Sequence, residues 1–518
     1  MLKFFEALVN FLWGLPIIVI ILGTGFYFTF KTGFFQVVHL RHIFSETIMK
    51  IIKKGNKGEE GGEGLITPFE AVSTAIGGSV GVGNIGGVAT AMAVGGPGSL
   101  FWLWIAAFVG MILKMAEVAL GVYYRERDEK GELYGGPTYY MEKGLGEEKG
   151  HKWWIIPAVI FGGGIFSTFF ITVQNYTVSE AMNSAFGIPI LYASIAYIVC
   201  NYIIIIGGIK GLGKLAGKLV PFMCLFYIIA AFYIIGVNIE NLPHAIKLVF
   251  SGAFSGTAAI GGFAGASFAH AVRIGMARSV FSNEAGWGTS PMIHASAQTD
   301  HPVKQGMWGA FEVFVDTMVV CTLTCFVIVI TGAWDSGLTG ATLTLSAFEK
   351  GMGSATSIFL AIGIFLFGVT TSSGWYAYYE IILRHLMKSS PKLKDVILKF
   401  YRIFYPIPGF LMVVIATTSG MPGQKVWLFA DFTTAVPTFV NVAVLFALSG
   451  TFFKLLKDYK TRYILKQEVK PEDQIPIFFE DVEEKENLEE IPAQDYDEEE
   501  EEERPVGQGA VLDEQMEE

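Results

Sequence analysis

Apolar stretches long enough to cross a membrane recur along most of the chain, and this recurrence limits the possible folds more than any other feature. A helix needs about 20 mainly apolar residues to cross a bilayer. Inside lipid, only helices and closed barrels satisfy their own backbone hydrogen bonds. We count eleven such stretches, at residues 9–30, 65–94, 99–124, 153–181, 187–208, 215–237, 252–292, 306–333, 354–384, 400–418 and 426–453. The sequence therefore predicts an all-α polytopic membrane protein with about eleven transmembrane helices.

The composition agrees with a membrane protein. Of the 518 residues 52% are hydrophobic and only 16% are charged, whereas a soluble domain carries about 25% charged residues. The first apolar stretch is long enough to span and lacks a small-residue cleavage site, so it is predicted to be a helix rather than a signal peptide. The cysteines lie in apolar stretches and are expected to be buried side chains, not disulfides or metal ligands.

Positive charge predicts the orientation of these helices. Lysine and arginine gather in alternate loops, at 31–57, 125–143, 210–218, 384–402 and 454–462, with Lys304 in the loop between the third and fourth of these groups. Loops rich in these residues remain in the cytoplasm. We therefore expect a multi-pass plasma-membrane protein with its N-terminus outside and its C-terminus in the cytoplasm.

One predicted helix contains too much glycine to be continuous. Glycine occurs six times between Gly77 and Gly87, and each costs about 0.8–1 kcal/mol in a helix interior. Non-helical backbone at membrane depth is tolerated only where protein buries it or where it lines a cavity. We therefore predict a break whose freed carbonyls and amides can hold an ion and a small polar ligand. Close packing between helices is the alternative explanation for the glycines.

A second glycine-rich stretch, 252–292, predicts an internal repeat. Each of the two stretches begins a group of five spans, one group starting from the inside and the other from the outside. Two broken helices at corresponding places are typical of inverted-repeat transporters, although close packing also explains the second cluster. The predicted organisation is an extra helix with a basic loop (1–64), a first repeat (65–237), a second repeat (252–455) and a disordered acidic cytoplasmic tail (467–518).

Asn84 is the one amide within the predicted break. Its oxygen can ligate a hard cation and its NH2 group can donate to a carboxylate. Because half-helix ends also favour a carboxylate or a cation, the break suits a zwitterion that binds together with Na+. Capping of the broken helix by Asn84 is the alternative.

Other polar side chains within apolar spans are candidates for the same site. Gln174 and Asn175 either face a cavity or make interhelical hydrogen bonds, since an unbonded amide at membrane depth is costly. The hydroxyls of Thr371 and Ser372 can join carbonyls as Na+ ligands, or bond back to their own helix. Trp375 lies one turn beyond Thr371, where it either caps the pocket and limits side-chain size or only packs.

The polar segment 278–297 and several acidic residues complete the candidates. Phe281 can form a wall of the pocket, and residues 282–284 are typical of a helix cap or restart. Glu284 can pair with Arg278 or Arg273, and Lys114 has the spacing to pair with Glu117. Three further acids lie within or near spans, at Glu312, Asp316 and Asp431.

Motifs for other chemistry do not occur. The chain has no HExxH, CxxC or phosphate-binding loop, so an enzyme is not expected. No filter-like motif or ring of charge favours a channel. Neither nucleic acid nor an obligatory protein partner is indicated, and no covalent cofactor is expected.

Three long motifs resemble the alanine or glycine:cation symporter family. They are AVSTAIGGSVGVGNIGGVATAMAVGGPGSLFWLW, RSVFSNEAGWGTSPMIHASA and GVTTSSGWYAYYE, and the resemblance extends in order from the first span to about residue 460. The family implies a leucine-transporter-like fold and uptake of alanine or glycine driven by Na+, sometimes by H+. By position it implies Na+ ligands at Gly77, Val80, Gly368, Thr371 and Ser372. It implies amino-acid contacts at Gly81, Gly83, Asn84, Gln174, Phe281, Thr371 and Trp375.

The sequence leaves two alternatives open. One is a transporter of the same fold that is coupled to H+ or carries another small amino acid or an amine. The other is a non-transporting membrane sensor, which the acidic tail would suit.

Overall fold

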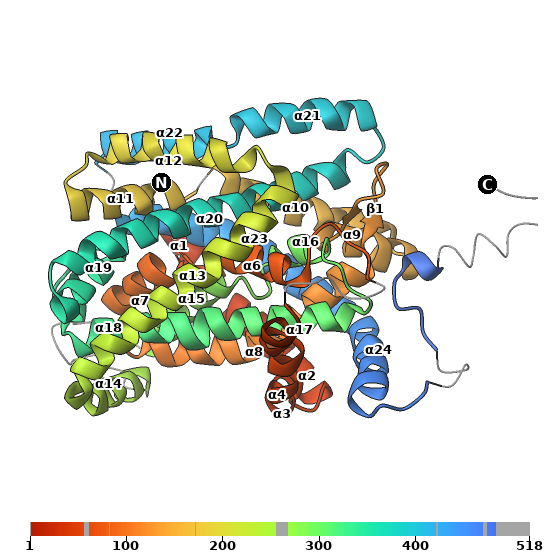
Figure 1. Cartoon of the computed structure of the whole chain (residues 1–518), viewed down its shortest axis with the longest axis horizontal. Helices are drawn as coiled ribbons and strands as arrows, with labels where there is room; N and C mark the ends of the chain where they lie inside the picture. The colour runs from red at the N-terminus through yellow and green to blue at the C-terminus, as the bar shows by residue number, and fades with distance from the viewer. Residues whose placement is uncertain are drawn as a thin grey trace, which may run out of the picture.

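The computed structural model describes residues 2–55, 62–81, 83–170, 172–254, 268–420, 423–469 and 474–482. Helices form almost all of this part of the chain (Figure 1). Its strands are β1 (Glu126–Arg127) and β2 (Leu133–Tyr134), which pair antiparallel as a short hairpin. The all-α fold class predicted from the apolar stretches is therefore confirmed.

The helices follow one another with few long connections. The first half contains α1 Leu2–Leu12, α2 Leu15–Lys31, α3 Phe35–Val38, α4 Leu40–Glu46, α5 Ile48–Lys54, α6 Pro68–Ser79, η1 Gly83–Gly87, α7 Val88–Gly95, α8 Ser99–Tyr123, α9 Pro137–Tyr140, η2 Met141–Glu148, η3 Lys152–Trp154, α10 Ile155–Phe170, α11 Gln174–Phe186, α12 Ile190–Ile205, α13 Gly208–Val237 and η4 Ile239–Asn241. The second half contains α14 Leu242–Phe254, α15 Phe268–Asn283, α16 Ser290–His294, α17 Pro302–Val313, η5 Phe314–Cys321, α18 Thr322–Ile330, η6 Ala333–Asp335, α19 Gly340–Met352, α20 Ala355–Leu386, α21 Pro391–Phe404, α22 Ile407–Thr418, α23 Gly423–Ala447, α24 Ser449–Tyr459 and η7 Lys460–Ile464.

Eight helical stretches of the described chain are long and apolar enough to cross a membrane. They coincide with eight of the predicted spans. The other three predicted spans are the shorter apolar helix Ile190–Ile205 and the two glycine-rich stretches, which are divided into shorter helices. The total of eleven and the inverted repeat stay predictions.

Helix α8 is largely buried, and α17 packs alongside it (Figure 1). From Val109 to Tyr123 every residue of α8 is buried. The contact is close because α17 presents glycine: a Cβ atom at Gly306 would lie 2.7 Å from the carbonyl oxygen of Met115, and one at Gly309 would lie 2.9 Å from Val118. Small residues at an interface allow the backbones of membrane helices to approach in this way.

The two glycine-rich stretches are joined at one end of the molecule. Residues just before α6 form isolated β-bridges with residues that follow α16, between Glu63 and Thr299 and between Ile66 and Ala297. Arg125, at the end of α8, donates to the carbonyl oxygens of Glu63 and Ala297 at 3.2 Å each. One guanidinium therefore holds the ends of both stretches.

Part of the predicted disordered tail is packed against this end. The backbone N–H of Phe479 donates to the carbonyl of Tyr123 at 2.9 Å, and its side chain is only 7% exposed. The guanidinium of Arg125 lies 4.4 Å from the ring centre of Phe478. The prediction of disorder from residue 467 onward is therefore wrong for residues 474–482, because two aromatic side chains supply apolar area that the acidic composition conceals. Residues 483–518 lie outside the described part of the chain.

Replacing Gly306 by alanine is expected to destabilise the protein by about 1–3 kcal/mol, because the new Cβ meets backbone that cannot move aside. Gly23→Ala is the matched control: Gly23 is exposed on α2, and a Cβ atom added there would have no other atom within 4 Å. The control should be neutral or up to about 1 kcal/mol more stable, since alanine favours the helix. The measurement is thermal unfolding in detergent, and equal midpoints for the two variants would contradict the packing argument.

Candidate functional site

The predicted break between Gly77 and Gly87 is present in the structure. Helix α6 begins with a capping box between Thr67 and Glu70 and ends at Ser79. Val80 has an extended conformation, and the chain returns to helix only at Gly83, as the wider π-helical turn η1. All described residues of this segment are buried. The freed backbone groups must therefore find partners within the protein.

Asn84 supplies one of these partners and ties the break to another helix. Its Oδ1 accepts a hydrogen bond from the backbone N–H of Gly81 at 2.9 Å, and its Nδ2 donates to the carboxylate of Asp316 at 2.7 Å. Asp316 also accepts from Ser282 at 2.9 Å and from Thr317 at 2.7 Å. In this structure the side chain of Asn84 thus links the break to a buried carboxylate, rather than facing an open cavity.

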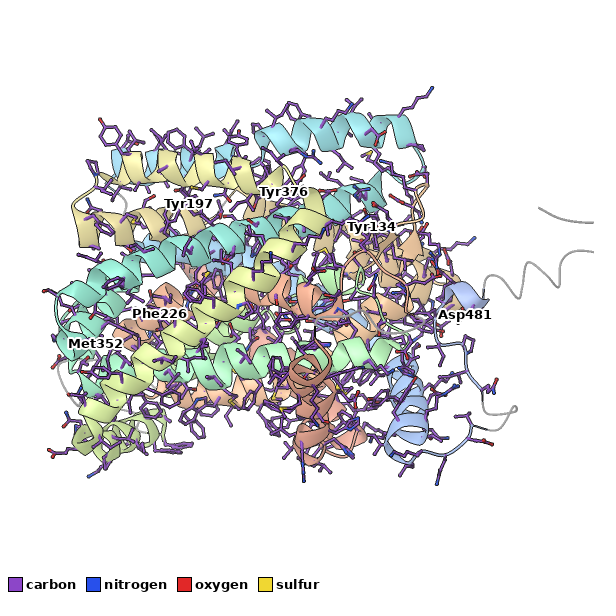
Figure 2. All side chains as sticks on the ribbon, viewed as in Figure 1. Tyr134, Tyr197, Phe226, Met352, Tyr376 and Asp481 are labelled. Atoms are coloured by element: carbon purple, nitrogen blue, oxygen red, sulfur yellow. The ribbon has the colours of Figure 1, made fainter. Side chains whose placement is uncertain are left out.

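The predicted Na+ ligands form two pairs in the structure. The hydroxyl of Thr371 on α20 donates to the carbonyl of Gly77 at 2.9 Å, so helix α20 contacts the last turn of α6. The carbonyl of Gly368 and the hydroxyl of Ser372 instead meet at the phenol of Tyr197, at 2.5 and 2.6 Å. Figure 2 labels Tyr197, which reaches α20 from α12. Val80 caps α6, next to the first pair.

Gly81 and Gly83 allow close contact on either side of the break. A Cβ atom at Gly81 would lie 2.6 Å from the hydroxyl oxygen of Thr371. One at Gly83 would lie 3.1 Å from the Cα of Ser282 and 3.4 Å from the ring of Phe281. Four of the predicted substrate residues, Gly81, Gly83, Phe281 and Thr371, are therefore neighbours.

The structure describes only part of the second glycine-rich stretch, 252–292. Residues 255–267, which hold most of that cluster, lie outside the described residues. The interruption that the structure describes follows α15, where Glu284, Gly286 and Gly288 have φ angles of 56°, 81° and 87°. The helix resumes at Ser290. Asn283 caps the end of α15 by accepting from the N–H of Ala285 at 2.9 Å, as expected for a helix end.

Buried charges surround both interruptions. Lys114 pairs with Glu312 at 3.2 Å and also donates to the carbonyl of Asn283 at 2.8 Å. The predicted pair of Lys114 with Glu117 is not formed: Glu117 accepts instead from Asn441 at 3.0 Å. Ionisable groups at membrane depth are costly and face the protein interior.

The predicted pairing of Glu284 with Arg278 or Arg273 also differs, since Arg273 contacts Asn10 and His270. Arg278 pairs with Asp431 of α23 and not with Glu284. Glu284 accepts from the hydroxyl of Thr289 at 2.6 Å. Sequence spacing along one helix does not indicate the partner of Arg278, because Asp431 comes from a distant helix.

A cavity opens beside the break, between α10, α11, α12, α15, α20, α22 and α23. Of the predicted site residues Gln174, Phe281, Ser372 and Trp375 line it, whereas Gly81, Gly83, Asn84 and Thr371 do not. Asn175, the neighbouring amide, also lines it. The cavity volume is about 40 Å³, counted as space open to the centre of a water molecule. By the ~10–15 Å³ that one water needs, it has room for about three.

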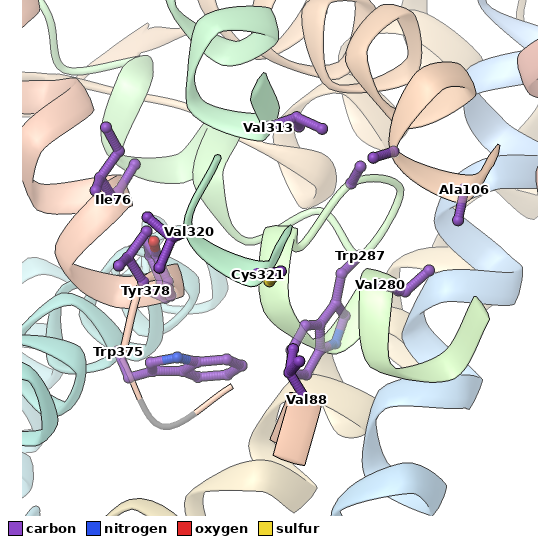
Figure 3. Packing of buried hydrophobic residues seen from close by; sticks show 14 of the residues in the cluster. Ile76, Val88, Ala106, Val280, Trp287, Val313, Val320, Cys321, Trp375 and Tyr378 are labelled. Carbon is purple, nitrogen blue, oxygen red and sulfur yellow. The ribbon is translucent and has the colours of Figure 1, made fainter. Parts of the chain in front are cut away.

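Sequence reasoning missed several lining residues, above all Trp287 and Tyr197. The ring of Trp287 lies 4.9 Å from that of Trp375 and 5.7 Å from that of Phe281, centre to centre. Figure 3 shows the two tryptophans adjacent to each other. An aromatic residue between two glycines at membrane depth was the available signal for Trp287, and a hydroxyl in an apolar helix was the signal for Tyr197.

Comparison with known proteins identifies the family. The family model described as the sodium:alanine symporter family matches residues 1–474. The sodium/alanine symporter AgcS of Methanococcus maripaludis is 36% identical over 476 residues, which cover 90% of this chain and 99% of that protein. The probable sodium/glutamine symporter GlnT of Bacillus subtilis is also 36% identical, over 91% of this chain and 92% of its own.

A solved structure shares the fold. The crystal structure of MhsT in complex with L-phenylalanine aligns with a TM-score of 0.52 at 14% identity, over 79% of this chain and 91% of that one. This likeness confirms the predicted leucine-transporter-like fold. The comparisons favour transport over the alternative of a non-transporting sensor. The chain belongs to the sodium:alanine symporter family and is a multi-pass membrane protein that transports amino acids with a cation, not an enzyme.

Proposed function

We propose that the protein imports alanine or glycine, or both, together with Na+ by alternating access. The observation that carries the proposal is the contact between the hydroxyl of Thr371 and the carbonyl of Gly77 at 2.9 Å, next to the break. Oxygen atoms from a hydroxyl and from freed carbonyls are the ligands that a hard cation prefers. A cation at this point would bind α6 and α20 at the same time.

We place Na+ at Gly77, Val80, Gly368, Thr371 and Ser372. We place the amino acid against Gly81, Gly83, Asn84, Gln174, Phe281, Thr371 and Trp375. Because Asn84 is bonded to Asp316 here, its role in this state is to hold the backbone of Gly81, while the backbone groups freed by the break face the amino acid. The aromatic wall of the small cavity supports a small side chain.

The proposed topology places the N-terminus outside and the C-terminus in the cytoplasm of the plasma membrane, with repeats at 65–237 and 252–455. The alternating basic loops support this orientation. The two interruptions, one in each proposed repeat, support the inverted symmetry.

A second substrate has a specific observation in its favour. The relative named as a probable sodium/glutamine symporter is as similar to this chain as the relative named as a sodium/alanine symporter. Coupling to H+ is the alternative for the ion, since another relative is named as a putative sodium/proton-dependent alanine carrier. Both alternatives keep the same fold and site.

Uptake of labelled alanine into proteoliposomes tests the proposal directly. An inward Na+ gradient should drive accumulation, and a membrane potential of 100 mV should add about 50-fold for each net charge moved, since this is worth about 2.3 kcal/mol. Asn84→Ala should abolish uptake, because it removes one of the donors to Asp316 and leaves the N–H of Gly81 without its acceptor. Accumulation driven by an H+ gradient alone would show that the coupling ion is H+ and not Na+. No accumulation under either gradient would contradict the proposal that alanine is a substrate.

The ion site can be tested at Thr371. Thr371→Val removes the hydroxyl and should raise the Na+ concentration for half-maximal uptake at least 10-fold, whereas Thr371→Ser should stay close to wild type. Ser373→Ala is a matched control on the same helix, because the hydroxyl of Ser373 is bonded back to Val369 at 2.7 Å. If Thr371→Val and Ser373→Ala show the same Na+ dependence, Thr371 is not a ligand.

Trp375 is proposed to limit the size of the side chain. Trp375→Ala should admit leucine, because removing the indole enlarges the cavity at its aromatic wall. Trp153→Ala is the control, since Trp153 is 52% exposed and does not line the cavity. Competition by leucine against alanine uptake is the measurement. A Trp375→Ala variant that transports alanine normally and still excludes leucine would show that Trp375 is not the filter.

A further inference from the structure

Residues 474–482 lie across the end of α8, and we call this segment the strap. The backbone N–H of Phe479 donates to the carbonyl of Tyr123 at 2.9 Å, and its ring lies 5.4 Å from that of Tyr124, centre to centre. The Nζ of Lys143 lies 5.4 Å from the centre of the same ring. Only 7% of Phe479 is exposed. Its side chain is therefore the anchor of the strap.

The strap also covers the side chain of Arg125. The guanidinium carbon lies 4.4 Å from the ring centre of Phe478, within the range of a cation–π contact. Although it is charged, Arg125 is only 3% exposed. Burial lowers the pKa of Arg125 to about 10, and the carboxylates of Glu480 and Asp481, which Figure 2 labels, act in the opposite direction. The strap thus supplies both cover and counter-charge to one guanidinium.

Arg125 is also the residue that joins the ends of the two glycine-rich stretches. It donates to the carbonyl oxygens of Glu63 and Ala297 at 3.2 Å each. The two segments bond directly as well, since the N–H of Leu65 donates to the carbonyl of Ser296 at 2.8 Å. If these segments moved apart, Arg125 could keep only one of its two carbonyl partners.

The cover over Arg125 favours the joined arrangement. A guanidinium that is shielded from water needs acceptors within the protein, because a buried charge without them is costly. Once the strap is removed, water can replace either carbonyl as an acceptor, so separation of the two segments costs less. The docked strap and the joined segments therefore stabilise each other through Arg125.

Aromatic contacts, rather than surface charge, hold the strap in place. Arg127 pairs with Glu480 at 3.5 Å, but their side chains are 44% and 22% exposed. Ion pairs in contact with water contribute little and are screened by salt. Burial of the Phe479 ring is the larger contribution, because removal of apolar area from water does not depend on ionic screening. Phe479 is therefore the residue to change.

We propose that the strap is an intramolecular lock on this end of the protein. While Phe479 is docked, Arg125 holds the two segments together, and release of the strap lets them separate. The inference rests on the proposed function, whose topology places this end in the cytoplasm, where the amino acid and the cation would leave. It adds regulation to that function, since docking of the chain's own C-terminal segment sets how often this end opens.

A cysteine at position 296 measures the opening. Ser296 is fully buried where the two segments meet, and Ser296→Cys exchanges only an oxygen for a sulfur. Its rate of labelling by a maleimide follows the fraction of molecules in which this end is open. The measurement uses the purified full chain in detergent, so that the reagent reaches both ends. The same chain without Ser296→Cys gives the background from the native cysteines.

Variants of the strap then test the lock. Phe479→Ala should speed the labelling at least 5-fold, the lower end of the range for coupled sites. Phe479→Leu keeps most of the apolar volume and should stay closer to wild type. Gln474→Ala is the matched control, because Gln474 is an exposed residue of the same segment. It should leave the labelling rate unchanged.

The native cysteines distinguish opening from unfolding. Cys321 is fully buried within the helices, so its labelling reports global unfolding. We expect this background to stay unchanged in Phe479→Ala. Phe478→Ala, which removes the cover of Arg125 but keeps the anchor, is measured in the same way and should also speed the labelling of Ser296→Cys. It decides the question if Phe479→Ala unfolds the protein.

The outcomes separate the two proposals. Equal labelling rates in the wild type and in the phenylalanine variants that stay folded would overturn the lock, even if Na+ drives alanine uptake. Faster labelling in these variants, with Gln474→Ala unchanged, would support the lock even if alanine is not accumulated. In that last case the proposed substrate would fail alone.

Discussion

The ion pair between Lys114 and Glu312 connects the ends of three helices, and the geometry around the break depends on it. Lys114 donates to the carbonyl at the end of α15, while Glu312 accepts from Ser290 at the start of α16 at 2.9 Å and from Ser79 at the end of α6 at 3.4 Å. Both partners are fully buried. Removing one partner of such a pair costs about 3–5 kcal/mol, since it leaves a charge without compensation. Two interrupted helices are thereby held against α8 and α17 by one charged contact.

The break itself is stabilised by partners from three other elements. Asn84 engages Asp316 of η5, Thr371 of α20 reaches Gly77, and Thr344 of α19 donates to the carbonyl of Ile85 at 2.8 Å. In a continuous helix, the backbone groups of this segment would be hydrogen-bonded within the helix. Here these side chains bond or orient them instead. Non-helical structure at membrane depth is thus possible because side chains distant in sequence replace the helical hydrogen bonds.

Local composition predicted the elements better than it predicted their partners. The glycines from 77 to 87 located the first break correctly, because a residue's cost in a helix is a local property. The partners of Asn84 and Lys114 lie far along the chain, at Asp316 and Glu312, and no spacing along one helix indicates them. The interruption after α15 was harder to place, because it is a short turn around Trp287 in which Glu284, Gly286 and Gly288 have positive φ angles. The packed segment 474–482 was missed because two phenylalanines outweigh the acidic composition around them.

These contacts divide the surroundings of the break into two sides. On one side Asn84, Asp316 and the pair of Lys114 with Glu312 join the break to α8, α15 and α17 through several buried bonds. On the other side α20 reaches α6 through the hydroxyl of Thr371, next to a glycine contact in which a Cβ at Gly374 would lie 3.2 Å from Gly78. A relative movement of α20 against α6 would break the bond of Thr371, whereas a movement of α6 and the break against α17 and η5 would break the bonds of Ser79 and Asn84. Under the proposed function the cation therefore binds between α6 and α20, which is the more weakly bonded of the two contacts. Its ligands come from both helices, so its binding energy can hold α6 and α20 together.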